Sequence, residues 1–194
     1  MIDSKTGKLQ KNWLETLAFD IHNLINSGVE IIIVSSGSIA LGKKQLYLKD
    51  NLSLDEKQAA AATGQITLAH AWKETMSKYK LNVAQILLAP DDTETRRKHL
   101  NARATLIKLL DLNVIPVINE NDTVSTDEIK FGDNDTLAAL VANLSQAKLL
   151  IILTDQDGLY TSDPKNNKSS KLVEEIALSD KNLNRYAGPS NSVL

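Results

Sequence analysis

The chain has 194 residues, 42% of them hydrophobic and 24% charged, which is enough for one globular domain with a sizeable core. A formal net charge of −2 and a pI of about 5.9 exclude the basic field that gathers nucleic acid or anionic lipid. The lack of cysteine excludes disulfides and cysteine nucleophiles, and no apolar run approaches the ~20 residues of a membrane span or forms a signal-peptide core. We therefore expect a soluble cytoplasmic protein with no nucleic-acid or membrane partner.

The first predicted element is a helix between Asn12 and Gly28. Asn12 and Glu15 form a capping arrangement at its start, and Gly28 supplies a stop. Apolar residues recur at helical spacing, and the inward positions are Leu14, Leu17, Ala18, Ile21, Leu24 and Ile25. The next run, residues 30–35, is β-branched and does not alternate with polar residues, which predicts a parallel strand covered on both faces.

The alternation of helix and strand then continues along the chain. We predict helices over residues 54–76, 95–110 and around 137–144, and strands over 83–88, 114–118 and 148–153, with 171–176 as a candidate for one more. The inward face of the helix over 54–76 is predicted at Ala62, Ile66, Ala69 and Trp72. Residues 161–170 are polar and predict an exposed loop. This order predicts an α/β sandwich with a mainly parallel sheet.

Small, polar or acidic residues follow four of the predicted strands. In open α/β sheets, ligands bind where strands end at their carboxyl edge, so a shared site is expected there. The four segments are Ser35-Ser36-Gly37-Ser38, Ala89-Pro90-Asp91-Asp92, Asn119-Glu120-Asn121-Asp122 and Thr154-Asp155-Gln156-Asp157-Gly158.

The segment after the first strand has two interpretations. Gly37 allows backbone N–H groups at a helix start to approach an anion, whereas the alternative is a plain helix cap made by Ser36. Gly37, Gly42 and Lys43 also come within one residue of the Walker A pattern. Lys44 stands where that pattern needs a hydroxyl for Mg²⁺, and residues 38–41 are typical of an ordinary first helical turn. We therefore reject a P-loop as the main interpretation and keep a P-loop nucleotide-binding protein as the rival hypothesis.

Two further segments carry chemistry, one suited to an amino acid and the other to phosphoryl transfer. The amides and carboxylates of residues 119–122 offer acceptors for an ammonium group and donors for carboxylates, although a simple turn is the alternative. Residues 132–136 open a helix with several acidic or amide side chains close to Lys130. In phosphoryl transfer a carboxylate orients lysines that neutralise the moving group, although helix capping explains the same residues.

Metal binding is not predicted. The segment 154–158 lacks the remaining ligands of a calcium loop, with Asn166 at the final glutamate position. His22, His70 and His99 share no spacing that suits a metal. Residues 96–98 are predicted to form a solvated basic helix face, one turn from Asp91 and Asp92.

Five segments together resemble the glutamate 5-kinase branch of the amino-acid kinase family. They are SSGSIALG (35–42), HLNARATL (99–106), VIPVINENDTV (114–124), EIKFGDND (128–135) and LTDQDGLYTSDP (153–164). The resemblance covers the chain from about residue 7 to residue 194. It implies the three-layer αβα sandwich of amino-acid and carbamate kinases, here without its first strand.

The resemblance also implies ATP-dependent phosphorylation of the L-glutamate γ-carboxylate, the first step of proline biosynthesis, with Mg²⁺, proline as feedback inhibitor and a homo-oligomeric enzyme. By position, the residues that would hold glutamate are Ser36, Gly37, Asn119, Asp122 and Asn134. Asp135 would be catalytic, by orienting lysines, while Thr154 and Asp155 would lie by the nucleotide.

The chain departs from the family at both ends. Family members begin with a V-K-x-G-[ST] strand and continue with a G-T-G-G-M-x-T-K segment, and each segment supplies a lysine to the phosphates. Neither is present in residues 1–194. We therefore expect weak or no kinase activity from these residues alone, the alternative being a catalytically inactive module that binds glutamate or proline.

Overall fold

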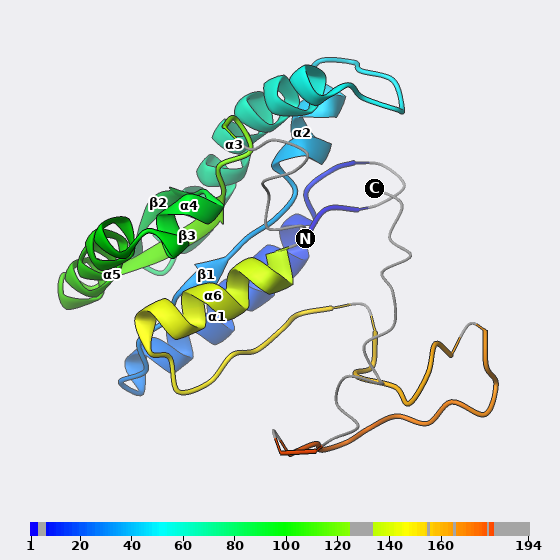
Figure 1. Cartoon of the computed structure of the whole chain (residues 1–194). Coiled ribbons are helices and arrows are strands. Elements are labelled where there is room, and N and C mark those ends of the chain that lie inside the picture. Colours follow the sequence, from blue (N-terminus) through cyan, green and yellow to red (C-terminus); the bar gives the residue numbers. More distant parts are fainter. Residues whose placement is uncertain (4–6, 125–133, 155, 165, 178, 181–194) are drawn as a thin grey trace. The chain divides into compact units, whose positions relative to one another are not determined.

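The computed structural model describes residues 1–3, 7–124, 134–154, 156–164, 166–177 and 179–180. The chain divides into two units, residues 1–150 and a second one that starts at Ile151, and Figure 1 labels the helices and strands of the first unit. The helices and strands of the first unit are α1 (Lys11–Asn26), β1 (Ile33–Val34), α2 (Ser38–Gln45), α3 (Leu54–Ser77), β2 (Asn82–Leu88), α4 (Pro90–Glu94), α5 (Arg96–Asp111), β3 (Val114–Glu120) and α6 (Asn134–Ser145).

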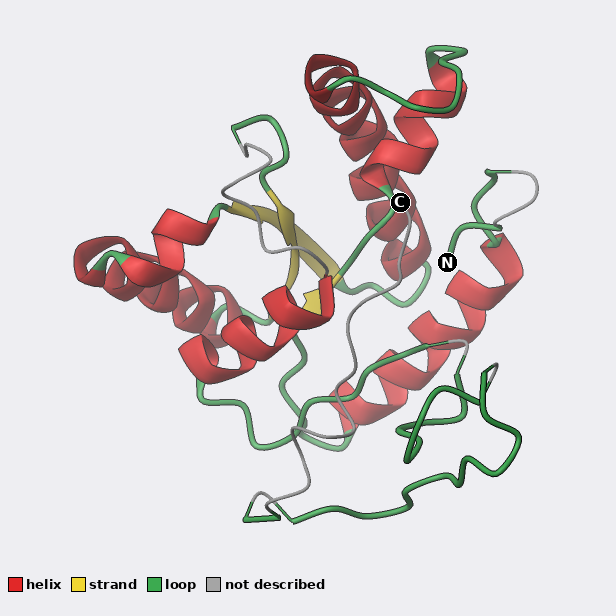
Figure 2. Cartoon of the chain, turned by 45° about the vertical axis from the view of Figure 1, so that its right-hand side comes forward, coloured by secondary structure: helices red, strands yellow, loops and turns green. Residues whose placement is uncertain are grey.

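The three described strands form a parallel sheet in the order β1-β3-β2 (Figure 2). Ile33 lies opposite Val117 on one side of β3, and Val83 lies opposite Ile115 on the other. The parallel strands predicted at residues 83–88 and 114–118 are confirmed, and the one predicted at 30–35 is confirmed only over Ile33–Val34.

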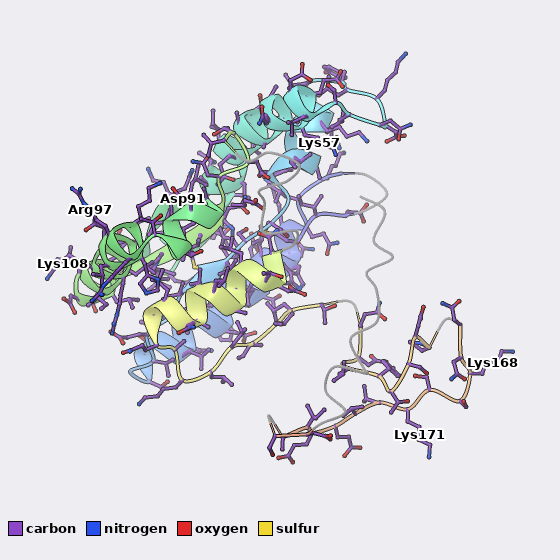
Figure 3. All side chains as sticks on the ribbon, viewed as in Figure 1. Lys57, Asp91, Arg97, Lys108, Lys168 and Lys171 are labelled. Atoms are coloured by element: carbon purple, nitrogen blue, oxygen red, sulfur yellow. The ribbon has the colours of Figure 1, made fainter. Side chains whose placement is uncertain are left out.

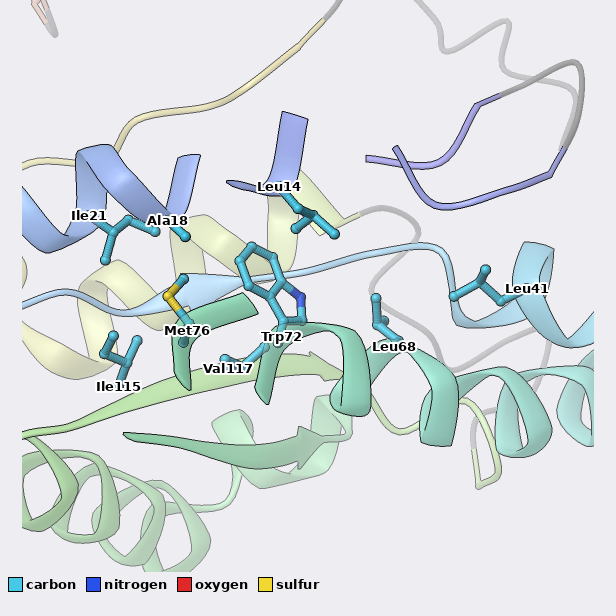
Figure 4. Packing of buried hydrophobic residues seen from close by; sticks show 9 residues of the cluster. All are labelled: Leu14, Ala18, Ile21, Leu41, Leu68, Trp72, Met76, Ile115 and Val117. Carbon is cyan, nitrogen blue, oxygen red and sulfur yellow. The ribbon is translucent and has the colours of Figure 1, made fainter. Parts of the chain in front are cut away.

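Helices cover both faces of this sheet. Ile115 and Val117 of β3 pack into one core with α1 and α3, including Leu14, Leu68 and Trp72 (Figure 4). Ile118, on the opposite face of the strand, packs into a second core with α5 and α6. Side chains of a strand alternate between its faces, so a strand that is apolar throughout needs a cover on each. The predicted αβα sandwich is confirmed.

The start and one face position of α1 differ from the prediction. The helix begins at Lys11, so Asn12 lies inside its first turn and is not its cap. Leu24 is 43% exposed, which makes its predicted inward position wrong, whereas Leu14 is buried as expected. Gly28 has φ +88°, a left-handed conformation that favours glycine and that ends the helix as predicted.

The predicted inward face of α3 is largely wrong. Trp72 is buried, but Ala62 is exposed and Ile66 is 74% exposed. The cause is α2, which lies so close to α3 that a Cβ on Gly42 would be 1.7 Å from the backbone oxygen of Ala60. Two helices that approach this closely bury their small residues, so the apolar pattern alone misplaces the face. Residues 38–41 form the first turn of α2, as expected for an ordinary helix rather than a P-loop.

The strand predicted at residues 148–153 is wrong, because these residues form no strand in the part of the chain that the structure describes. Leu149, Ile151 and Leu153 are exposed. A strand forms only where a neighbouring edge accepts its backbone hydrogen bonds, and none of the three described strands pairs with this run. Residues 171–176 form no strand either, although Leu172 makes one antiparallel bridge with Tyr160. None of the described helices has the length and apolarity to cross a membrane.

Trp72 links the core to the end of β1. Its indole Nε1–H donates a hydrogen bond of 2.9 Å to the Ser35 hydroxyl, in a buried position. We expect Trp72→Phe to lower the free energy of unfolding by about 1–2 kcal/mol, because it removes this bond and leaves a small void. Trp13→Phe, at a position that is 37% exposed, is the matched control and should change it by less than about 0.5 kcal/mol. Equal losses in denaturant unfolding would contradict a role for the hydrogen bond.

Candidate functional site

Three of the four polar segments meet at the carboxyl edge of the sheet. The Ser35 N–H donates to the Ile118 oxygen at 2.8 Å, which continues the alignment of β1 with β3 beyond the strand. On the other side, the Asn121 N–H donates to the Leu88 oxygen at 2.8 Å. These bonds place the ends of β1, β2 and β3 at one edge, as predicted, although Asp91 and Asp92 after β2 pair with Lys98 rather than with the other two segments. The fourth segment, residues 154–158, belongs to the second unit.

A chain of hydrogen bonds joins four side chains at this edge. The Ser38 hydroxyl donates to Asp122 Oδ2 at 3.2 Å, and Asn119 Nδ2 donates to Ser38 Oγ at 3.3 Å. Asn119 Nδ2 also donates to Gln65 Oε1 at 2.8 Å. Ser38 and Asn119 are buried, while Gln65 and Asp122 are half-buried. Polar groups buried in this way are held firmly because each has a partner.

The backbone geometry of α2 and α3 positions these hydrogen-bonded side chains. Gly37 precedes α2 with φ +106°, a conformation that lets the strand turn directly into the helix whose first residue is Ser38. A Cβ on Gly64 would lie 1.8 Å from the Ser38 backbone oxygen, so the two helices touch here backbone to backbone. Gln65 is the next residue of α3, and its side chain therefore lies within reach of Asn119.

A hollow of about 180 Å³ lies beside these residues. Its lining is Ala61, Ala62, Gln65, Ile66, Gln85, Leu87, Glu120, Asn121, Asp122 and Thr123. Pockets for drug-sized ligands measure ~300–1,000 Å³, so this hollow suits a smaller molecule. Its wall combines apolar side chains of α3 with amides and carboxylates from the end of β3, a mixture that suits a small polar ligand.

The predicted substrate residues Ser36 and Asn134 lie at the starts of two helices, beside α2 and in α6. Ser36 is exposed, and the helix cap is Gly37 rather than Ser36, so the plain-cap interpretation of Ser36 is wrong. Asn134 is the first residue of α6, and its Oδ1 is buried without a hydrogen-bond partner among the residues that the structure describes. An acceptor left in this state is suited to a donor on a ligand. Asp135 is exposed in the same first turn.

The predicted nucleotide residues belong to the second unit. Thr154 is exposed, and its hydroxyl accepts a hydrogen bond of 3.3 Å from the Gln156 N–H. Asp155 lies outside the described residues, as do Lys130 and residues 131–133 of the acidic segment. Within the described part of the chain, no three His, Cys, Asp or Glu side chains gather as metal ligands would.

Two residues of the hydrogen-bonded row, Ser38 and Gln65, are not among the predicted site residues. In the segment 35–38 the family resemblance implies Ser36 as a ligand residue, and not Ser38. Gln65 lies outside the predicted inward face of α3, because the apolar pattern does not show the contact with α2. The run of small residues around Ala60, together with Gly64, is the available signal, because it indicates a helix that a neighbour approaches closely.

The acidic segment after β2 is paired with a cation. Lys98 Nζ lies 2.6 Å from Asp91 Oδ2 and 3.3 Å from Asp92 Oδ1, so one member of the predicted solvated face reaches these acids (Figure 3 labels Asp91). The hydrogen bond from Lys98, with a second from Thr95, holds the pKa of Asp91 below its ordinary value. Both groups of the pair are at the surface.

The Lys98→Met variant should raise the pKa of Asp91 toward its ordinary value, because it removes the hydrogen bond and the charge of Lys98. Because the folded-state pKa is lowered, the pair stabilises the fold above the unfolded-state pKa, and this contribution is lost as pH falls through the folded-state value. Carboxyl ¹³C NMR titration measures the shift directly. Lys108→Met, which breaks the Lys108–Asp111 pair instead, should leave Asp91 unchanged. An Asp91 titration that is identical in wild type and Lys98→Met would contradict the pairing.

An αβα sandwich with a small polar hollow at its strand ends is a common arrangement for binding a small molecule. The sequence model described as "Amino acid kinase family" matches residues 1–187, and the chain belongs to this family. It is 49% identical to a glutamate 5-kinase of Paramagnetospirillum magneticum over 192 aligned residues. The alignment covers 99% of this chain and 52% of that relative. It is 50% identical to a glutamate 5-kinase of Rhodospirillum rubrum over 189 aligned residues, which are 97% of this chain and 50% of that relative. The chain spans about half the length of the curated relatives it matches. The resemblance found in the motifs is confirmed.

Proposed function

We propose that the protein containing this chain transfers the γ-phosphoryl group of ATP to the γ-carboxylate of L-glutamate. Relatives that are named glutamate 5-kinase and are 49–50% identical to this chain support the proposal. The observation in the fold that carries it is the hydrogen-bonded row Asn119–Ser38–Asp122, in which Asn119 and Ser38 are buried and Asp122 borders a small hollow at the sheet edge. An amide and a carboxylate held in this way supply fixed acceptors for the ammonium group of an amino acid.

The remaining substrate contacts are proposed by position. Ser36, Gly37 and Asn134 bind glutamate together with Asn119 and Asp122. The Oδ1 of Asn134 has no hydrogen-bond partner within the described residues, which supports its role as an acceptor. Asp135 orients the cations that neutralise the transferred group, and Thr154 with Asp155 contacts the nucleotide. Mg²⁺ enters with ATP as part of the substrate and reduces the repulsion between two anions. L-Proline is the proposed feedback inhibitor, and the active enzyme is a homo-oligomer.

The test is an assay of the full-length protein with L-glutamate and Mg-ATP. We expect ADP release that depends on glutamate, with an equal amount of acyl phosphate trapped as the hydroxamate. Asp122→Asn should lower kcat/KM by about 10²-fold, the cost of one preorganised contact, whereas the surface control Asp111→Asn should have no effect. ADP release that is independent of glutamate would overturn the proposal.

Residues 1–194 are assayed alongside as a separate arm. The alternative function, a glutamate- or proline-binding module, predicts heat of binding in calorimetry without ADP release. Turnover equal to that of the full-length protein would exclude this alternative for the shorter chain.

A further inference from the structure

The four-residue chain has a direction, and Asp122 sets it. An ionised carboxylate accepts hydrogen bonds and donates none, so the bond between Ser38 and Asp122 uses the single hydroxyl proton of Ser38. Toward Asn119, the Ser38 oxygen can then only accept. Asn119 must therefore present its NH₂ group to Ser38 rather than its carbonyl oxygen. The charge of Asp122 thus fixes, through Ser38, the orientation of the Asn119 amide.

Gln65 completes this arrangement from the other side. The Asn119 amide has two N–H groups, and the acceptors that they meet are Ser38 Oγ at 3.3 Å and Gln65 Oε1 at 2.8 Å. With both N–H groups engaged, Oδ1 is the atom that this amide can offer to a ligand. An acceptor in that position recognises a donor, such as an ammonium group, and disfavours a carboxylate.

We propose that Gln65 is a positioning residue: it holds the Asn119 amide so that its oxygen selects ligands that carry an ammonium group. This inference rests on the proposed function, because it concerns how the same site distinguishes an amino acid from a simple dicarboxylate. Gln65 is placed to do so because α3 is locked against α2 at Gly64, one residue earlier. Without the Gln65 oxygen, one N–H of Asn119 loses its acceptor and the amide gains freedom to turn.

The experiment compares L-glutamate with glutarate, which has the same two carboxylates and no ammonium group. Calorimetry on the full-length protein gives the affinity ratio of the two compounds for wild type, Gln65→Met and Gln65→Glu. We expect Gln65→Met to lower the ratio by roughly tenfold or more, because a hydrogen bond to a charged group contributes about that factor. Gln65→Glu keeps an acceptor facing Asn119 and should retain the ratio or raise it.

Two further variants separate positioning from simple structural damage. Gln45→Met is the matched control, since Gln45 donates to Thr67 across the same pair of helices at 2.5 Å but stands outside the four-residue chain. It should leave the ratio unchanged. Ser38→Ala removes the other acceptor of Asn119 and should lower the ratio in the same direction as Gln65→Met, which gives a second reading if Gln65→Met does not fold.

The outcomes distinguish this inference from the proposed function. Wild type that binds glutamate, with a ratio that neither Gln65→Met nor Ser38→Ala changes, overturns the role of Gln65 and leaves the proposed function intact. A ratio in Gln65→Glu as low as in Gln65→Met also overturns it, because the acceptor would then be irrelevant. Wild type that binds neither compound overturns the proposed function and this inference together.

Discussion

Gly64→Ala should lower the free energy of unfolding by about 3 kcal/mol, because the added methyl group meets rigid backbone. Its Cβ would lie 1.8 Å from the Ser38 oxygen and 2.5 Å from the Gly42 nitrogen. Neither atom can rotate away, so α2 and α3 must separate. In a chain of this size the loss corresponds to a fall in melting temperature of roughly 6–12 °C. Thermal unfolding followed by circular dichroism measures it.

The control for Gly64→Ala is Gly28→Ala. Gly28 has φ +88°, and no atom of the described part of the chain lies within 4 Å of the position that a Cβ would take. Its replacement therefore tests left-handed strain without a clash and should cost about 1 kcal/mol. If Gly64→Ala were no more costly than Gly28→Ala, the close approach of α2 to α3 would be wrong. Because Ser38 moves with α2, Gly64→Ala should also weaken glutamate binding, whereas Gly28→Ala should not.

Asn119→Asp should destabilise the fold by about 2–4 kcal/mol at pH 7, although the two side chains are nearly identical in shape. The variant places a carboxylate oxygen opposite Gln65 Oε1 and Ser38 Oγ, where Asn119 Nδ2 now donates. Asp122 adds a second negative charge at the far end of Ser38. Burial and this charge both favour the protonated form of the new acid, so its folded-state pKa is raised.

The raised pKa gives the Asn119→Asp variant a characteristic pH dependence. Below the unfolded-state pKa of about 3.9 the acid is protonated in both states and carries no charge penalty. The deficit relative to wild type grows as pH rises from there and is complete above the folded-state pKa. Denaturant unfolding at several pH values measures this curve, with the exposed Asn101→Asp as the control that should stay flat. A deficit independent of pH would mean that Asn119 is not buried among acceptors.

Much of the sandwich was predictable because its strands are short and mainly apolar. The run of β3 is buried over most of its length and the run of β2 is apolar apart from the exposed Asn82 and Gln85, and short runs of this kind between turns favour a strand. The run at residues 148–153 has the same composition but forms no described strand. Composition shows that a segment can be a strand, whereas the neighbouring edge decides whether it becomes one.

The site was predictable in its location but not in its connections. Polar residues at the ends of β1 and β3 had to meet at one edge because parallel strands end on the same side, and Ser38 meets Asn119 and Asp122 there. Their links through Ser38 and Gln65 depend on how closely α2 approaches α3. That distance is set by Gly42 and Gly64, which carry no side chain and so leave no mark in an apolar pattern.

The hydrogen bond between Trp72 and Ser35 makes the fluorescence of Trp72 sensitive to the end of β1. The chain has two tryptophans, and Trp72 is buried with its indole N–H bound to the residue that precedes the Ser36-Gly37 turn, whereas Trp13 is partly exposed. Indole fluorescence responds to the polarity and hydrogen bonding around the ring. Any shift of the β1 end therefore changes the emission of Trp72 against a steady background from Trp13, and the optical signal needs no attached dye.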